Sequence, residues 1–453
     1  MFSKNKILII ILVLALIIRV IFFIALGQNN GLSDKRIVAG DAEEYHGLAL
    51  SIIKEGKFSF NGELNTKRTP LYPLFVGIIY FFFGVRPWLV LLFQIFLDTI
   101  ICFLVYFLAM LIFNNKKAAL FSGFLYAIEP VSIVFSLALI SDVFFAFGFV
   151  CSLVLLFLAI KKERLSLFLL AGVILGLTTL IRPSTQYFPI LAIFIIFLLI
   201  KRPITYKIKA VIVFLLFFEL VLFPWQLRNF INFRSFNLSS IQGWILIHHN
   251  VAYTEANISH ISEDEARAKL EKLTPEEENL NSIDKSKIYQ KIAMEYIKSH
   301  PREYLLMSIK GTLNMYINTP KYELMTTLNL KRDTPRDEKK VFLSESFSER
   351  VKRILNTAGR EYYLTPLLGL MMLFEYVLAF IGLLWLLLKK HFKILIIFCL
   401  IIAYHSALMG VVGEARYKLS VIPLYLILAG WGFVVLIDYF RRKTRQMSNK
   451  VLL

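Results

Sequence analysis

Long apolar runs are the feature that most constrains what this chain can fold into. A bilayer core about 30 Å thick is crossed by roughly 20 helical residues, and ten runs approach or exceed that length. They lie at residues 7–27, 86–113, 118–138, 142–160, 165–181, 187–200, 207–230, 366–388, 393–411 and 417–440. Because 57% of the 453 residues are hydrophobic, the chain is too apolar for one soluble core. The sequence predicts an all-α polytopic membrane protein of about ten spans.

The positive charge of the chain predicts the orientation of these spans. The net charge is +19, yet six short segments beside the apolar runs hold 19 Lys and Arg residues and a single acid, Glu163. These segments are residues 1–6, 114–117, 161–164, 201–209, 389–393 and 441–453. The positive-inside rule places all six, and therefore both termini, in the cytoplasm. The charge is thus an orientation signal, and no nucleic-acid partner is expected.

One shorter apolar run, at residues 70–84, does not fit this topology as a span. Between the first external loop and the cytoplasmic residues 114–117 the chain can cross only once, and the run at 86–113 makes that crossing. Pro70 and Pro73 also interrupt the start of the short run. We therefore expect residues 70–84 to form an interfacial or re-entrant helix on the outer side.

The topology divides the chain into three regions. Residues 1–230 would form an N-terminal transmembrane core, with a first external loop at 28–69 and the interfacial helix at 70–84. Residues 231–365 would form an external loop domain that contains helix-like stretches. Residues 366–453 would hold the C-terminal transmembrane helices and a short basic cytoplasmic tail.

Charged side chains at the outer membrane boundary are the candidates for chemistry, because charges near lipid are costly and tend to be functional. Carboxylates and guanidinium groups from several distant places in the chain map to this one face. They are Asp41, Glu44, Arg68, Glu129, Asp142, Arg182 and Arg416, with Tyr45, Tyr72 and Tyr417 as accompanying candidates for substrate binding. One active site at the outer water–lipid boundary would have this pattern.

The residue types suit group transfer from a lipid phosphate. A carboxylate such as Asp41, or Glu44 beside it, can accept the proton of an attacking hydroxyl. Arginine side chains can hold a phosphate whose charge grows as it leaves, and their planar fork matches phosphate oxygens. A polyprenyl-phosphate monosaccharide would leave as a phosphate monoester, with its polyprenyl chain against lipid-facing helices. That reaction needs positive charge but no obligatory metal, because Arg can supply the charge.

Several of these residues also have a plainer structural interpretation. Asp41 is a good helix N-cap for a helix that starts near Ala42. Glu43 and Glu44 suit the first turn of such a helix, where the helix dipole favours acids. Arg68 could extend from a helix end to the membrane interface.

Polar residues within the spans predict packing rather than chemistry. Gln94 and Asp98 are four residues apart, so they share one helix face and suit hydrogen bonds between helices. The cysteines and histidines have no CxxC or HExxH spacing, so no metal site and no required cofactor are predicted. A divalent cation held by Asp41 and Glu43 is the weaker alternative.

Taken in order along the chain, these residues resemble those of a known family. The matching motifs are the apolar run that ends at Arg19, Asp41 with Tyr45, RTPLYP at residues 68–73, Gln94 with Asp98, Glu129-Pro130, Ser141-Asp142, Arg182-Pro183, His300-Pro301 and Arg416-Tyr417. Over nearly its whole length the chain resembles the GT-C glycosyltransferases of family 39. That family includes protein O-mannosyltransferases and bacterial lipid A aminoarabinose transferases.

The resemblance implies a GT-C fold, an extracytoplasmic active site and an inverting reaction. The implied donor is a polyprenyl (undecaprenyl) phosphate-linked sugar, and the acceptor is left open among lipid, glycan and protein. The family's catalytic first-loop Asp maps to Asp41. Protein mannosyltransferases have an adjacent Asp-Glu pair in this loop, whereas Asp41 is followed by Ala42. This departure favours the bacterial group, and with it a location in a bacterial cell (inner) membrane.

Two other classes of protein are weighed against a transferase. A transporter or flippase of a lipid-linked sugar would place its charged groups near the membrane midplane, often in two related halves. Here the polar residues gather at the outer boundary, and no paired halves are evident. A polymerase or ligase of surface polysaccharide would use diphosphate-linked donors, so comparing monophosphate with diphosphate donors would distinguish it.

Overall fold

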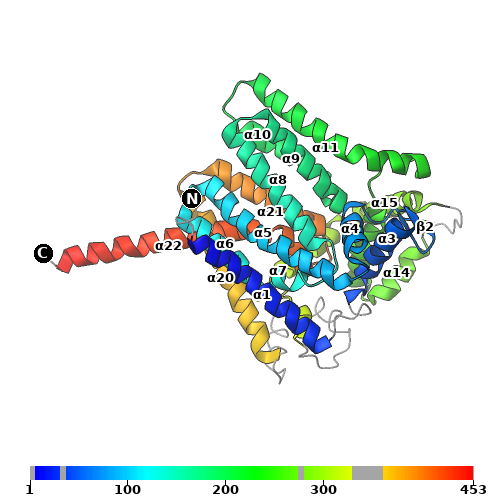
Figure 1. Cartoon of the computed structure of the whole chain (residues 1–453), viewed down its shortest axis with the longest axis horizontal. Coiled ribbons are helices and arrows are strands. Elements are labelled where there is room, and N and C mark those ends of the chain that lie inside the picture. The colour runs from blue at the N-terminus through cyan, green and yellow to red at the C-terminus, as the bar shows by residue number, and fades with distance from the viewer. Residues whose placement is uncertain (1–5, 31–36, 274–279, 329–360, 452–453) are drawn as a thin grey trace.

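The computed structural model describes residues 6–30, 37–273, 280–328 and 361–451, and most of these are helical (Figure 1). The apolar bundle contains α1 (Lys6–Asn30), α5 (Pro87–Phe113), α6 (Lys116–Ile128), α7 (Pro130–Phe135), α8 (Asp142–Lys162), α9 (Leu165–Ile181), α10 (Phe188–Leu199), α11 (Ile204–Phe233), α20 (Glu361–Leu388), α21 (Phe392–Met409) and α22 (Ile422–Val451).

The remaining elements lie between or beside these helices. They are α3 (Asp41–Glu55), a hairpin of β1 (Ser59–Phe60) and β2 (Glu63–Leu64), α4 (Leu71–Phe83), the 3-10 turn η2 (Pro183–Thr185), α12 (Ile241–Ile245), the π-helical segment η3 (Leu246–Val251), α13 (Ala252–Ser259), α14 (Glu263–Glu271), α15 (Ser282–Ser299), α16 (Pro301–Ile317), α17 (Lys321–Thr327) and the 3-10 turn η4 (Ala415–Ser420).

Among the described residues, seven helices are long and apolar enough to cross a membrane: α1, α5, α8, α11, α20, α21 and α22. The chain is therefore a multi-pass membrane protein. The predicted count of ten spans is not confirmed. The runs at 165–181 and 187–200 form helices of 17 and 12 residues, and at 1.5 Å per residue the shorter is only about 18 Å long.

The predicted span at 118–138 is not one continuous helix, because the helix breaks at Glu129-Pro130 into α6 and α7. Proline has no N–H to continue the helical ladder, so carbonyl groups just before the break need other donors. The fully buried Arg19 of α1 supplies them, donating to the carbonyl oxygens of Ala127 at 3.0 Å and Tyr126 at 3.4 Å. Its Nε lies 2.5 Å from the Asp98 carboxylate, so the guanidinium charge is also paired.

Close contacts at glycines hold the bundle together. A Cβ on Gly432 of α22 would lie 1.9 Å from the Leu378 carbonyl oxygen of α20, and one on Gly172 of α9 would lie 2.3 Å from the Phe214 carbonyl oxygen of α11. Small residues of this kind let helix backbones approach closely in membranes. The helices at the centre are α8 and α22, whose most apolar windows are the most buried of the seven.

The run at residues 70–84 forms the helix α4, and its position at the interface stays a prediction. It has 13 residues, which is about 20 Å and shorter than a bilayer core. Phe81, Phe82 and Phe83 at its end are exposed on the protein surface. Both features suit a helix at the interface rather than a span.

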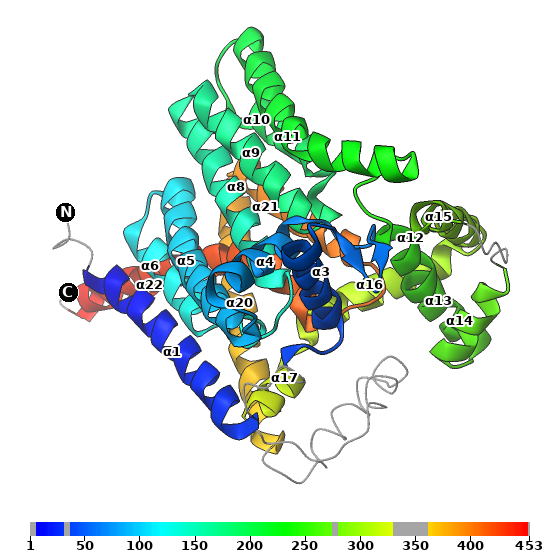
Figure 2. The same ribbon diagram turned by 45° about the vertical axis from the view of Figure 1, so that its right-hand side comes forward.

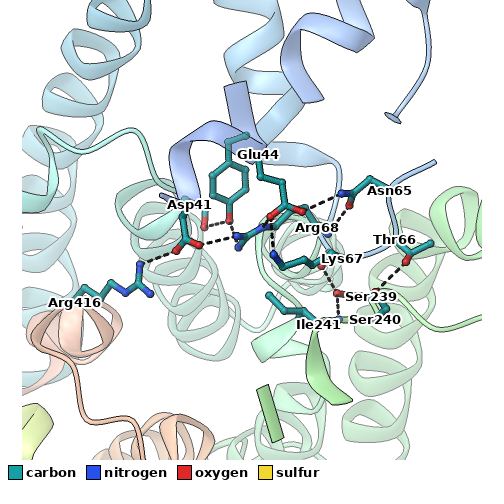
Figure 3. A network of polar contacts seen from close by, with 12 residues as sticks. Asp41, Glu44, Asn65, Thr66, Lys67, Arg68, Ser239, Ser240, Ile241 and Arg416 are labelled. Atoms are coloured by element: carbon teal, nitrogen blue, oxygen red, sulfur yellow. Dashed lines mark hydrogen bonds and ion pairs between the residues drawn. The ribbon is translucent and has the colours of Figure 1, made fainter. Parts of the chain in front are cut away.

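The helices α12 to α15 lie together at one side of the molecule, and α16 runs from them to η4 and α21 of the bundle (Figure 2). The helix-like stretches expected from the sequence correspond to α14, α15 and α16. The start of this region is bound to the first loop, since the Ser240 amide donates to the Thr66 carbonyl oxygen at 2.9 Å and the Ser239 hydroxyl donates to the Lys67 carbonyl oxygen at 2.5 Å (Figure 3). The loop before α4 is therefore held by contacts with the segment before α12.

Candidate active site

Asp41 is the first residue of α3, at the point where the chain turns into the helix. Gly40 occupies the N-cap position, and its φ is 62°. No side chain caps this end of the helix with a hydrogen bond. A backbone with this positive φ suits glycine. Asp41 is therefore not the N-cap that one interpretation of the sequence suggested, and its carboxylate is directed to other partners.

Arg68 is the residue that organises the first loop. Its Nη2 donates to Asp41 Oδ1 at 2.8 Å, its Nε donates to Glu44 Oε2 at 2.8 Å, and its Nη1 donates to the Tyr45 hydroxyl at 3.2 Å. The guanidinium also lies 4.7 Å from the centre of the Tyr45 ring. Asp41, Glu44 and Tyr45 all lie in the first two turns of α3, so one guanidinium fixes three side chains from the same helix.

Arg416 reaches the same carboxylate from the far end of the chain. It belongs to η4, and its Nη1 donates to Asp41 Oδ2 at 2.9 Å. Figure 3 shows Asp41 between the two guanidinium groups, one on each carboxylate oxygen. Nη2 of Arg416 donates to the Tyr417 hydroxyl at 3.1 Å. Nε of Arg416 forms an ion pair with Glu414 at 2.9 Å.

A second acid–base pair lies next to Arg416. Asp142 is the first residue of α8, and Arg182 is the C-cap residue that follows α9. Asp142 Oδ1 accepts a hydrogen bond from Arg182 Nη1 at 2.5 Å. The Arg182 guanidinium lies 5.8 Å from the centre of the Tyr417 ring. Asp142, Arg182, Arg416 and Tyr417 all line one narrow hollow. Two arginine side chains, each about one quarter exposed, therefore share one concave surface.

Two predicted site residues have structural partners instead. Tyr72 is fully buried and donates to Gln94 Oε1 at 2.6 Å, and Gln94 in turn donates to the Ala138 carbonyl oxygen at 2.7 Å. Glu129 is fully buried too, and its Oε2 accepts from the Ser132 amide as the N-cap of α7. Neither residue lines the hollow beside Arg416. The packing role expected for Gln94 and Asp98 is confirmed.

The arginine charges set the protonation of the first-loop acids. Burial raises the pKa of the Asp41 carboxyl, but the positive charges of Arg68 and Arg416 outweigh it and hold that pKa well below its usual range. For Glu44, burial is outweighed by Arg68 and Lys67, so its pKa is also lowered. Both carboxylates are ionised at neutral pH, and Asp41 is in the form that accepts a proton.

Sequence reasoning missed the residues that support the first loop. Lys67 lies 3.1 Å from Glu44 Oε2, and Asn65 donates to Glu44 Oε1 at 3.0 Å while accepting from the Arg68 amide. The Asn65 carbonyl oxygen accepts from Arg228 at 3.1 Å. The only signal in the sequence was their position immediately before the RTPLYP motif.

The charged groups near Asp41 do not form a cluster with the composition of a metal site. Within the described ranges, no group of three or more His, Cys, Asp or Glu side chains is close enough to hold a metal ion. The two Asp41 oxygens bind guanidinium groups, and the Glu43 side chain is exposed on the surface of α3.

With this geometry described, the chain can be compared with known proteins. Residues 67–226 match the family model described as dolichyl-phosphate-mannose-protein mannosyltransferase. This stretch includes Arg68, Asp142 and Arg182, whereas Asp41 and Arg416 lie outside it. No curated protein matches the chain significantly.

Among solved structures, the apo oligosaccharyltransferase of Archaeoglobus fulgidus is 15% identical, with a TM-score of 0.52 over 99% of this chain and 52% of that one. The chain has the GT-C fold. It spans about half the length of that archaeal protein. ArnT from Cupriavidus metallidurans also matches, at 12% identity in its apo form and 11% when bound to undecaprenyl phosphate. Both ArnT matches have a TM-score of 0.41 and cover 95% of this chain and 77% or 78% of ArnT.

The resemblance to GT-C glycosyltransferases of the family 39 type is thus confirmed. Within this fold the candidate site is assembled from four separate segments: the start of α3, the loop before α4, the α8–α9 pair and η4.

Proposed function

We propose that this GT-C protein is a glycosyltransferase that moves one sugar from a polyprenyl-phosphate donor to an acceptor on the extracytoplasmic side. The observation that carries the proposal is the position of Asp41. Its ionised carboxylate lies 2.9 Å from Arg416, and Arg416 shares a hollow with Arg182. A base and two phosphate-binding cations are therefore adjacent, as transfer from a lipid phosphate requires.

The proposed reaction is a single displacement. An acceptor hydroxyl attacks the anomeric carbon of the donor sugar, and the bond from that carbon to the phosphate oxygen breaks. The hydroxyl proton passes to Asp41, and the lipid leaves as a phosphate monoester with the bonding electron pair. Because attack and departure occur on opposite faces, the anomeric configuration inverts. Arg416 and Arg182 would stabilise the charge that develops on the phosphate.

The two arginines on Asp41 would have different roles. Arg68 is about one tenth exposed and is bound to three side chains of α3, so we assign it to orienting Asp41. Arg416 is more exposed and lies at the hollow. A donor phosphate that binds Arg416 would compete with Asp41 for this guanidinium. Asp41 would then lose one of the charges that lower its pKa and become a stronger base in the donor complex.

The type of donor and the location are further parts of the proposal. The matching family model is named for a lipid monophosphate sugar, dolichyl-phosphate-mannose, which supports a polyprenyl monophosphate donor here. We place the site on the outer side of a bacterial inner membrane, with both termini in the cytoplasm, because the short loops are basic. Arginine can supply the positive charge, so we propose that no metal ion is required.

The test is a transfer assay with purified protein in membranes. Radiolabelled polyprenyl-monophosphate sugars are offered with extracts of lipid, glycan and protein acceptors, in parallel with diphosphate-linked donors. Transfer from monophosphate donors that is lost in Asp41→Asn supports the proposal. Transfer from diphosphate donors alone would favour a polymerase or ligase. Movement of the labelled lipid across proteoliposomes without transfer would favour a flippase.

A further inference from the structure

The 3-10 turn η4 carries Arg416, and it also carries a buried lysine. Lys418 is 0% exposed, whereas Arg416 extends to the hollow. A 3-10 helix has three residues per turn, so side chains two positions apart project to different sides. Arg416 therefore faces Asp41 while Lys418 points into the protein. Lys418 does not line the hollow and takes no part in the proposed reaction.

The end of α16 holds η4 on both sides of Arg416. The Lys418 ammonium donates to the Asn318 carbonyl oxygen at 2.9 Å, and the Asn318 side chain donates to the Gly413 carbonyl oxygen at 2.9 Å. Gly413 has a φ of 57°, and a Cβ there would lie 2.4 Å from the Gly311 carbonyl oxygen of α16. The segment from 413 to 418 thus has little freedom to shift along α16.

Two buried acids from other helices belong to the electrostatic surroundings of Lys418. Glu129 lies at the break between α6 and α7, and Glu375 lies within α20; both are 0% exposed. Each interacts electrostatically with Lys418. Among the described residues, both Glu375 oxygens and Glu129 Oε1 are without a hydrogen-bond partner. The hydrogen bonds of the Lys418 ammonium go to the Asn318 carbonyl oxygen and to Met372 Sδ, so the two acids are buried polar neighbours of Lys418 rather than its direct partners.

We propose that Lys418 is a positioning residue, which ties η4 to the end of α16, near the buried acids Glu129 and Glu375, so that Arg416 meets Asp41. The inference rests on the proposed function for its consequence in catalysis, but the geometry itself can be tested without activity. The proposal also gives the break at Glu129-Pro130 a role, because α7, which begins at this break, packs against η4.

The first experiment is a double-mutant cycle. Lys418→Met is measured for kcat/KM toward the lipid-linked donor, both alone and in an Arg416→Ala background. If Lys418 acts through Arg416, we expect a loss of about tenfold or more in the first case and less than about twofold in the second. An equal loss in both backgrounds would overturn the proposal. Lys418→Arg keeps the charge and should restore part of the activity.

Two further variants guard against simple loss of the fold. Glu375→Gln is nearly isosteric and removes one acid beside Lys418, so it should show the same coupling to Arg416→Ala. Lys393→Met is the control. Lys393 is exposed at the start of α21, the end farther along the chain from η4, so this change should leave kcat/KM unchanged. A Glu375→Gln variant that folds and shows no coupling to Arg416→Ala counts against the anchor.

The second experiment needs no transfer activity. Cysteines are placed at positions 41 and 416, in a protein whose Cys102, Cys151 and Cys399 are changed to alanine, and joined with a short bifunctional thiol reagent. We expect the cross-linked fraction to fall several-fold when Lys418→Met is added and to be unchanged by Lys393→Met. An unchanged fraction with Lys418→Met overturns the anchor, even if transfer is established. If no donor is ever used, the proposed function fails while this measurement still decides the positioning.

Discussion

The Arg416 guanidinium lies 2.9 Å from the Asp41 carboxylate, although 375 positions separate the two residues in the chain. This pair joins the start of α3 to the turn η4 before the last helix. With Arg68 on the other oxygen, the Asp41 carboxylate is held in one orientation and stays ionised. Arg416 is also the member of the pair that lines the hollow, together with Arg182.

Asp41→Asn should abolish transfer while leaving donor binding largely intact. The amide cannot accept the acceptor's proton, and general base catalysis typically contributes about 10²–10⁴-fold. We expect kcat to fall by at least about 100-fold in the membrane assay. Glu43→Gln is the matched control, because Glu43 is exposed two residues away and lies outside the arginine network. Full activity in Asp41→Asn would refute the proposed base.

Arg416→Ala and Arg68→Ala should differ in kind. A charge-assisted hydrogen bond is worth about 1.5–3 kcal/mol. Because Arg416 would bind the donor phosphate and its developing charge, loss of Arg416 should lower kcat/KM for the donor by roughly 10–150-fold, with a higher donor KM as well as a lower kcat. Loss of Arg68 should mainly lower kcat, because Asp41, Glu44 and Tyr45 lose their common partner. Steady-state kinetics at saturating acceptor separates the two. The assignment of roles is wrong if both variants change only KM.

The pH dependence should report the exchange of Arg416 between Asp41 and phosphate. In the free protein the pKa of Asp41 is lowered by Arg68 and Arg416. The ionised form therefore persists as the pH falls, and kcat/KM should stay flat down to about pH 4, near the ordinary value for Asp. In the donor complex Arg416 binds phosphate, so the acid limb of kcat should lie at higher pH. Coincident acid limbs would argue against the exchange.

Removal of divalent metal ions should not lower the rate. The positive charge on the leaving phosphate is assigned to Arg416 and Arg182, and both Asp41 oxygens bind guanidinium groups. Dialysis against a chelator, followed by the transfer assay with and without added Mg²⁺ or Mn²⁺, measures this. A loss of activity that metal restores would instead support a cation at Asp41 and Glu43.

Breaking the buried Arg19–Asp98 pair should destabilise the protein strongly. Both side chains are 0% exposed, and removing one partner of such a pair costs about 3–5 kcal/mol. Arg19→Met should lower the thermal unfolding temperature in detergent, and Arg19→Met combined with Asp98→Leu should lower it less than the sum of the two single changes. Strict additivity would show that the two charges are not coupled.

Much of the fold could be predicted from the sequence because lipid imposes simple rules. Apolar runs such as residues 86–113 had to become helices, since backbone groups in lipid must bond within their own segment. The break at Glu129-Pro130 could not be predicted in the same way. Proline can be tolerated within a membrane helix when other groups satisfy the freed carbonyls, and here those groups come from Arg19, more than 100 residues away.

The candidate site, like the fold, was predicted from the sequence only in part. The sequence by itself indicated that Asp41, Arg68, Arg182 and Arg416 share one face of the membrane, because charge in short loops fixes orientation. Only the tertiary structure decided that Arg68 hydrogen-bonds to side chains of α3 while Arg416 lines the hollow. It also directed Tyr72 and Glu129 to buried partners. Which side chains touch depends on helix packing and on the path of η4, and these contacts join residues too distant in the chain for any local pattern to encode.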